Sequence, residues 1–152
     1  MKKSKNNLGY FVLGCGILIS ALVLIFMTFT GIEYNVFIGK AQYSVYELLS
    51  FGDKTRIGVV LAMAFVIAAL AFAVFIIVLK LVNVKFRFGG WLALLAAVLS
   101  LAAGIMFFCI KGLIGESDNG LVSLAIGGIL CGILAILNAF VLGFYAVLEL
   151  KK

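Results

Sequence analysis

The sequence predicts an all-α integral membrane protein, a bundle of four transmembrane helices that occupies residues 1–152 as a single domain. Apolar residues make up 66% of the chain and charged residues only 12%, with a mean hydropathy of +1.31. A soluble domain is about 45–50% apolar and about 25% charged, so a core of this size cannot hide the excess. Four apolar stretches also reach the about 20 residues that a helix needs to cross a bilayer.

The first of these spans is expected at about residues 8–30, after a short basic head. It is too long for the apolar region of a signal peptide, and no Ala-x-Ala-like cleavage site follows, so we expect an uncleaved helix. The other spans are expected at about residues 57–79, 91–110 and 121–148, and none of the four has a charged residue in its interior.

The basic residues predict the orientation of these spans. The head, the connection over residues 80–90 and the tail hold eight basic residues, whereas the other two connections hold four. This asymmetry places the N- and C-termini in the cytoplasm, because cytoplasmic loops carry the excess of Lys and Arg. We therefore expect a multi-pass protein of the plasma (cell) membrane. The abundance of Lys, Ile and Phe is typical of an AT-rich bacterial genome.

Residues 31–56 form the longest segment between spans, and we expect a small outer loop there with a β-hairpin and a short helix. Tyr34, Val36 and Ile38 alternate with Glu33, Asn35 and Phe37. Gly39-Lys40 is the expected two-residue turn. Ser44 and Glu47 have capping-box spacing, which predicts a helix over residues 45–50 that ends at Gly52.

Two roles stay open for this outer loop. Val45, Leu48 and Leu49 favour a lid that rests on the bundle. The alternative is a recognition surface, since loops often carry function.

Small residues predict how the helices pack. On the fourth span they recur every four residues, as Gly127, Cys131, Ala135, Ala139 and Gly143. Such a ridge allows two helix backbones to approach closely, which favours association within a bilayer. The ridge either packs against other helices of the same bundle or forms a docking face for a second membrane protein or a second copy of the chain.

Asn138 lies beside this ridge near the middle of the fourth span. An amide that faced lipid would be costly, so we expect it to donate a hydrogen bond to another helix. Ser100 and a backbone carbonyl are the candidate acceptors.

The connection before the third span alternates basic and aromatic residues. Lys85 and Arg87 are candidates for contacts with anionic lipid headgroups, and the simpler interpretation is that they fix the topology.

The composition excludes several kinds of chemistry. The chain has no His, and its three Cys lie within apolar spans without a Cys-x-x-Cys pair. We therefore expect no catalytic residues, no metal, no cofactor and no thiol-oxidoreductase site. The net charge of +6 is explained by membrane topology, so nucleic acid is not an expected partner.

The order of four spans with a long first outer loop resembles the topology of claudin-like tetraspan proteins. Residues 31–56 contain neither Trp nor Cys, so that family's loop signature is absent and no functional residue is carried over.

The leading hypothesis for function is a non-enzymatic protein that acts by contact, as an accessory subunit, scaffold or protective factor of another membrane protein. Charged residues inside spans mark most ion and proton pathways, and this chain has none there. The alternative is an oligomeric transporter or permeation pathway for lipid or small apolar solutes. The partner, the ligand and the oligomeric state do not follow from the sequence.

Overall fold

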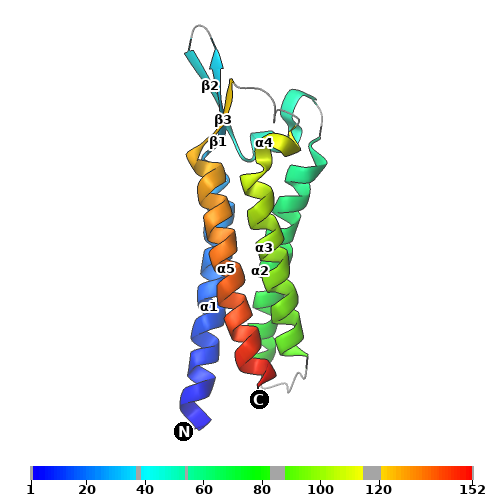
Figure 1. The fold of residues 1–152 in the computed structure, drawn as a ribbon. Helices are drawn as coiled ribbons and strands as arrows, with labels where there is room; N and C mark the ends of the chain where they lie inside the picture. The colour runs from blue at the N-terminus through cyan, green and yellow to red at the C-terminus, as the bar shows by residue number, and fades with distance from the viewer. Residues whose placement is uncertain (1, 37–38, 54, 83–87, 115–120, 152) are drawn as a thin grey trace.

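Four long helices run side by side in the computed structural model, which describes residues 2–36, 39–53, 55–82, 88–114 and 121–151 (Figure 1). They are α1 (Lys2–Phe26), α2 (Ile57–Leu81), α3 (Gly89–Phe108) and α5 (Ile126–Leu150). Each is long and apolar enough to cross a membrane, so the protein is membrane-embedded and mostly helical. Both termini lie at one end of the bundle, called here the termini end, and the strands lie at the opposite, sheet end.

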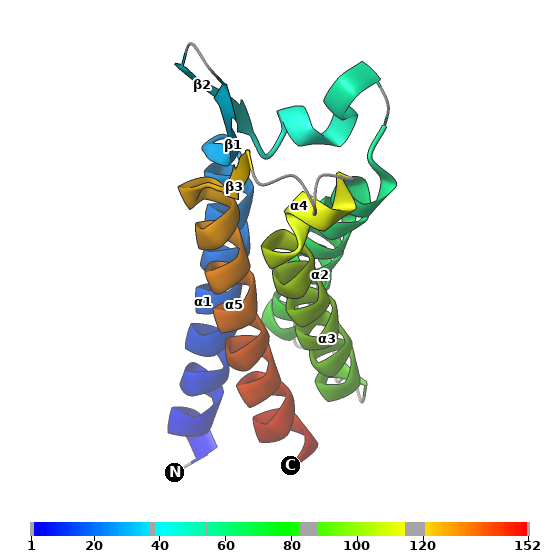
Figure 2. The ribbon, with the colours of Figure 1, turned by 45° about the horizontal axis from the view of Figure 1, so that its top comes forward.

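The four helices form a closed ring in which each is antiparallel to its two neighbours. Helices α1 and α3 each pack against both α2 and α5, and the α3–α5 contact is the most extensive (Figure 2). Small side chains fill the buried positions of α2 and α3, including Ala62, Ala69, Ala73, Ala93, Ala96, Ala103 and Gly104. They allow close approach of the backbones, which is how helices associate where lipid removes the hydrophobic driving force.

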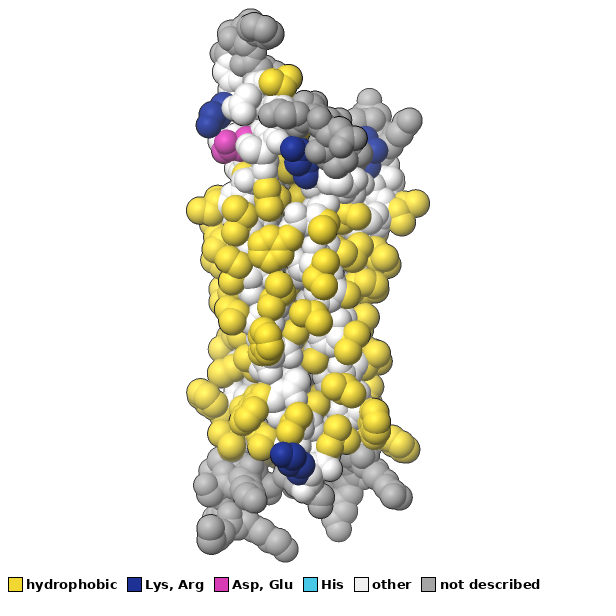
Figure 3. Space-filling model, in the orientation of Figure 1, with side chains coloured by type: hydrophobic (Ala, Val, Ile, Leu, Met, Phe, Trp, Pro, Cys, Tyr) yellow, Lys and Arg dark blue, Asp and Glu magenta, His cyan; other side chains and the backbone are white. Residues whose placement is uncertain are grey.

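Many large apolar side chains point outward. A belt of hydrophobic side chains covers the helices between the charged residues near the two ends (Figure 3). Phe11 and Phe140, for example, are 70% and 71% exposed. A surface of this kind is stable only against hydrocarbon, which agrees with the apolar composition of the spans.

A three-stranded antiparallel sheet lies beyond the helices. Its order is β2-β1-β3, with β1 (Thr30–Val36) between β2 (Gly39–Ser44) and β3 (Val122–Leu124). The sheet therefore joins the segment between α1 and α2 to the segment before α5 (Figures 1 and 2).

Two predicted spans are shorter than expected, one because of β3 and one because of β1. The fourth helix begins at Ile126 instead of residue 121, because Val122–Leu124 pairs with β1. The first helix ends at Phe26 instead of residue 30, because the chain turns at residues 27–29 and enters β1. A short apolar run that continues a helical span does not reveal its strand conformation by periodicity.

The third span is shifted by two residues, to Gly89–Phe108, and a separate single turn, α4 (Ile110–Leu113), follows it. The second span begins at residue 57 as predicted and continues to Leu81.

The hairpin is present, but the predicted turn is wrong. Gly39 and Lys40 belong to β2, so the β1–β2 connection falls on residues 37–38, which lie outside the described residues. Gly39 has φ +155°, a backbone conformation that a glycine adopts at little cost.

The helix predicted over residues 45–50 is present as a 3-10 helix, η1 (Glu47–Asp53), which begins two residues later than predicted. Its capping box is confirmed. The Ser44 amide and hydroxyl donate to Oε2 of Glu47 at 2.6 and 3.0 Å, and the Glu47 amide donates to Oγ of Ser44 at 3.3 Å.

Candidate functional site

Three polar side chains meet in the middle of the bundle. The Asn138 amide on α5 donates to Oγ of Ser20 on α1 at 2.8 Å and to Oγ of Ser100 on α3 at 3.1 Å. All three side chains are at most 2% exposed. The predicted hydrogen bond to Ser100 is therefore present, and Ser20 is a second acceptor that the sequence did not single out for this bond.

The two serines complete this polar layer through the backbone. Ser20 donates to the Gly16 carbonyl at 3.0 Å, and Ser100 donates to the Ala135 carbonyl at 2.8 Å. Each hydroxyl thus donates once and accepts once, which ties α1, α3 and α5 together. The buried Oδ1 of Asn138 has no hydrogen-bond partner among the described residues. The layer is well suited to fix the relative positions of three helices and offers no nucleophile–base pair.

The small-residue ridge of α5 lies largely within the bundle. Gly127, Cys131 and Ala135 are buried, whereas Ala139 and Gly143 are half-buried. A Cβ atom built on Gly127 would lie 2.6 Å from the Thr30 carbonyl oxygen, so the ridge begins where α5 meets the start of β1. The Cys131 thiol lies 3.6 Å from the Val23 carbonyl oxygen.

The closest backbone approach on α3 is at Gly104, which faces the same stretch of α5. A Cβ atom on Gly104 would lie 3.1 Å from the Gly132 carbonyl oxygen and 3.2 Å from the Ile136 amide nitrogen. Glycine is required here for packing and not for a special backbone angle.

An ion pair closes the termini end. Nζ of Lys80 on α2 lies 3.2 Å from Oε2 of Glu149 on α5, and both side chains are about one-fifth exposed. The same ammonium lies 4.6 Å from the ring centroid of Tyr145, and the Tyr10 hydroxyl donates to the Lys80 carbonyl at 3.0 Å. The sequence showed these charges only as ends of spans, since nothing in the spacing of residues 80 and 149 indicates that they pair.

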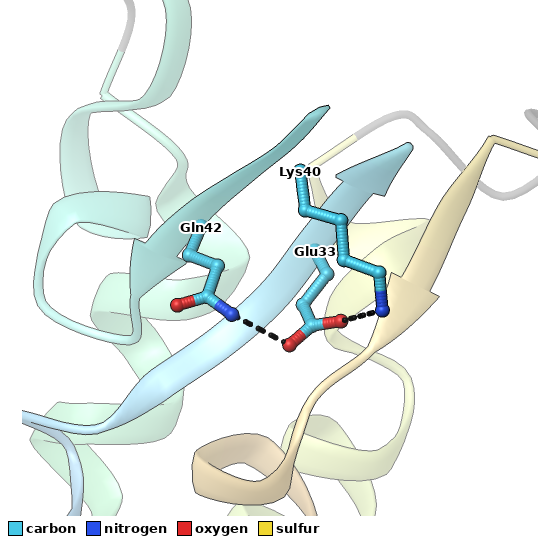
Figure 4. A network of polar contacts seen from close by, with 3 residues as sticks. All are labelled: Glu33, Lys40 and Gln42. Atoms are coloured by element: carbon cyan, nitrogen blue, oxygen red, sulfur yellow. Dashed lines mark hydrogen bonds and ion pairs between the residues drawn. The ribbon is translucent and has the colours of Figure 1, made fainter. Parts of the chain in front are cut away.

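The sheet has one apolar and one polar face. Ile32 and Val122 are buried toward the bundle, as the alternation of side chains along a strand requires. On the opposite face, Oε1 of Glu33 accepts from the Gln42 amide at 2.9 Å, and Oε2 lies 3.5 Å from Nζ of Lys40 (Figure 4).

Hydrogen bonds tie the sheet to the segments that adjoin α1 and α5 and to α1 itself. The Val45 amide donates to the Phe29 carbonyl at 3.2 Å, and the Ala125 amide donates to the Gly31 carbonyl at 2.9 Å. The Tyr46 hydroxyl donates to the Leu24 carbonyl at 2.9 Å. Val45 and Leu48 are fully buried, so the segment after β2 covers the end of the bundle as a lid. The polar face of the sheet points away from the bundle.

No family model, curated protein or solved structure matches this chain.

Two further predicted positions carry no structural evidence. Lys85 and Arg87 lie outside the described residues. Within the described ranges, no group of three Cys, Asp or Glu side chains is placed to hold a metal ion.

Proposed function

We propose that this protein is a non-enzymatic membrane protein that acts by contact with another membrane protein, as an accessory subunit, scaffold or protective factor. The observation that supports the proposal is the anchored sheet. It joins two distant segments of the chain, is tied to α1 by the hydrogen bond from the Tyr46 hydroxyl to the Leu24 carbonyl, and presents a polar face built on Glu33, Lys40 and Gln42. A polar surface held above an apolar bundle suits recognition of a partner's extramembrane part.

The polar layer supports the same proposal. Ser20, Ser100 and Asn138 bond to one another and to backbone carbonyls inside the bundle. The two hydroxyls and the Asn138 NH2 group thus hold helices together, and only the Asn138 Oδ1 is left without a partner among the described residues. A permeation pathway instead directs such groups toward its contents.

The proposal includes a topology, with both termini in the cytoplasm and the sheet outside a bacterial plasma membrane. The eight-to-four distribution of basic residues supports it. Cysteines introduced at Lys40 or Ser117 should react with an impermeant thiol reagent on intact cells, and cysteines at Lys5 or Lys85 should not. Labelling at Lys85 without lysis would show the opposite orientation.

The contact itself is tested by affinity capture from native membranes in a mild detergent. The wild-type protein should retain a stoichiometric partner, and Glu33→Arg should lose it, because reversal of this charge breaks the contacts with Lys40 and Gln42. Lys111→Glu on α4 is the control, a charge reversal at the same end of the bundle but off the sheet. Equal retention by wild type and Glu33→Arg would exclude the polar face as the contact.

A flux assay distinguishes this proposal from the alternative, an oligomeric pathway for lipid or small apolar solutes. Purified protein in liposomes should pass neither small ions nor dyes and should not accelerate lipid movement between leaflets. Saturable flux would overturn the proposal.

A further inference from the structure

An apolar groove runs between α1 and α5 in the half of the bundle nearest the termini. It has a volume of about 320 Å³ and is lined by Phe11, Val12, Cys15, Phe140, Val141 and Phe144. Val12 is only 8% exposed and forms part of the floor, whereas Phe11, Phe140 and Phe144 are 70%, 71% and 53% exposed and form the rims. The groove is thus shallow and open toward the surrounding lipid.

The rims determine what fits the groove. Close packing of a further transmembrane helix needs small residues on the contact surface, because a helix with its side chains is about 10 Å wide. Protruding phenylalanine rings from both α1 and α5 hold such a helix away from the floor. A single acyl chain is thin and flexible enough to lie between the rings against Val12 and Val141.

A cation lies beyond the open end of the groove. Lys151 is exposed and follows Phe144 by seven residues, and its amide still donates to the Val147 carbonyl at 3.2 Å, as in a helix. Seven residues of helix advance about 10 Å and return to within about 20° of the same face. Lys151 therefore follows the groove at the depth where the headgroup of a lipid in it would lie.

Of the two lysines at this end that belong to α2 or follow α5, Lys151 is the one to consider here, because Lys80 is already engaged. Lys80 lies 3.2 Å from Glu149 and against the ring of Tyr145, on the inward side of α5. No carboxylate contact is found for Lys151 among the described residues.

We propose that this groove is a binding site for an anionic phospholipid, with one acyl chain between the phenylalanine rims and the phosphate near Lys151. The site adds a lipid requirement to the protein and does not depend on the protein partner proposed above. The selectivity comes from the lysine and the retention from the groove, so the two contributions are separable by mutation.

The test uses the full chain in phosphatidylcholine vesicles that contain a minor fraction of a brominated lipid, which quenches tryptophan on contact. Trp91 is replaced by Phe, and Phe144→Trp places the single reporter on the rim of the groove. Brominated phosphatidylglycerol should bind at the reporter about fivefold more strongly than brominated phosphatidylcholine, the ratio expected from one lysine near the headgroup.

Two variants separate the contributions. Lys151→Gln should reduce the preference for phosphatidylglycerol to near unity, and Cys15→Phe should reduce quenching by both lipids because it fills the groove. Lys111→Gln removes the same charge at the sheet end and should change nothing. A second reporter, Phe75→Trp, lies on α2 at a matched distance from its helix end and should not respond to Lys151→Gln.

Two results would overturn the proposal. Equal quenching by both brominated lipids, unaffected by Lys151→Gln, would mean that the groove holds bulk lipid only. Protection of the Phe144→Trp reporter from both lipids, relieved as protein is diluted in lipid, would mean that a second copy of the chain covers the groove.

Discussion

Replacement of Gly104 by Ala should destabilise the bundle, whereas the same replacement at Gly143 should not. A Cβ atom on Gly104 would lie 2.7 Å from Cγ1 of Ile136, 3.1 Å from the Gly132 carbonyl oxygen and 3.2 Å from the Ile136 amide nitrogen. Carbon atoms in good contact are about 3.5–4.0 Å apart, so α3 and α5 must separate by several tenths of an ångström. On Gly143 the nearest atom is the Ala97 Cβ atom at 3.9 Å, an ordinary contact.

The magnitude follows from two opposed effects. Both substitutions gain up to about 1 kcal/mol of helix propensity, because both glycines lie within long helices. Gly104→Ala also incurs an overpacking cost of about 1–3 kcal/mol. The propensity gain cancels between the variants, so their free energies of unfolding should differ by about 1–3 kcal/mol.

Thermal unfolding in one detergent measures this difference. A change of 1 kcal/mol corresponds to roughly 2–4 °C in Tm for a chain of about this length, so Gly104→Ala should melt several degrees below Gly143→Ala. Gly14→Ala is a further control, because no atom lies within 4 Å of the added Cβ. If Gly104→Ala melts at or above Gly143→Ala, the α3–α5 contact is not the close approach described here.

Three further predictions use the same unfolding assay or amide exchange. Ala135→Leu should lower Tm more than Asn138→Leu. The first change overpacks a fully buried position at a cost of about 1–3 kcal/mol, whereas the second removes two hydrogen bonds worth about 0.6 kcal/mol each. The reverse order would contradict the placement of the ridge. Lys80→Gln should lower the free energy of unfolding by up to about 1 kcal/mol, because it removes the ion pair with Glu149. The double variant that also carries Glu149→Gln should regain part of this loss. Ser44→Ala should increase hydrogen exchange at the Glu47 amide and lower the free energy of unfolding by about 1 kcal/mol. Ser123→Ala, at an exposed position of β3, is the control and should change neither.

The helices could be predicted from the sequence because their signal is long. A run of about 20 apolar residues without interior charge has one stable state in a bilayer, and all four runs are helices. The capping box at Ser44 and Glu47 was likewise visible, since it depends on two residues at fixed spacing.

The parts that escaped prediction depend on contacts between distant residues. Val122–Leu124 continues an apolar span in the sequence and becomes a strand only because β1 has an edge to pair. The Lys80–Glu149 pair joins residues 69 positions apart, and the Ser20–Asn138 bond joins residues 118 apart. Periodicity carries no information on such pairs, whereas the Asn138–Ser100 bond could be named because so few polar residues lie within the spans.

The pairing of β1 with β3 also sets an order of assembly. The segments on either side of β1 are made early in synthesis, but β3 directly precedes α5, the last helix. Until that helix arrives, the Asn35 amide lacks the Leu121 carbonyl and the Gly31 carbonyl lacks the Ala125 amide. The sheet is completed only when the residues just before the final helix are in place, so a chain arrested after α3 would leave the edge of β1 open to pairing with another chain.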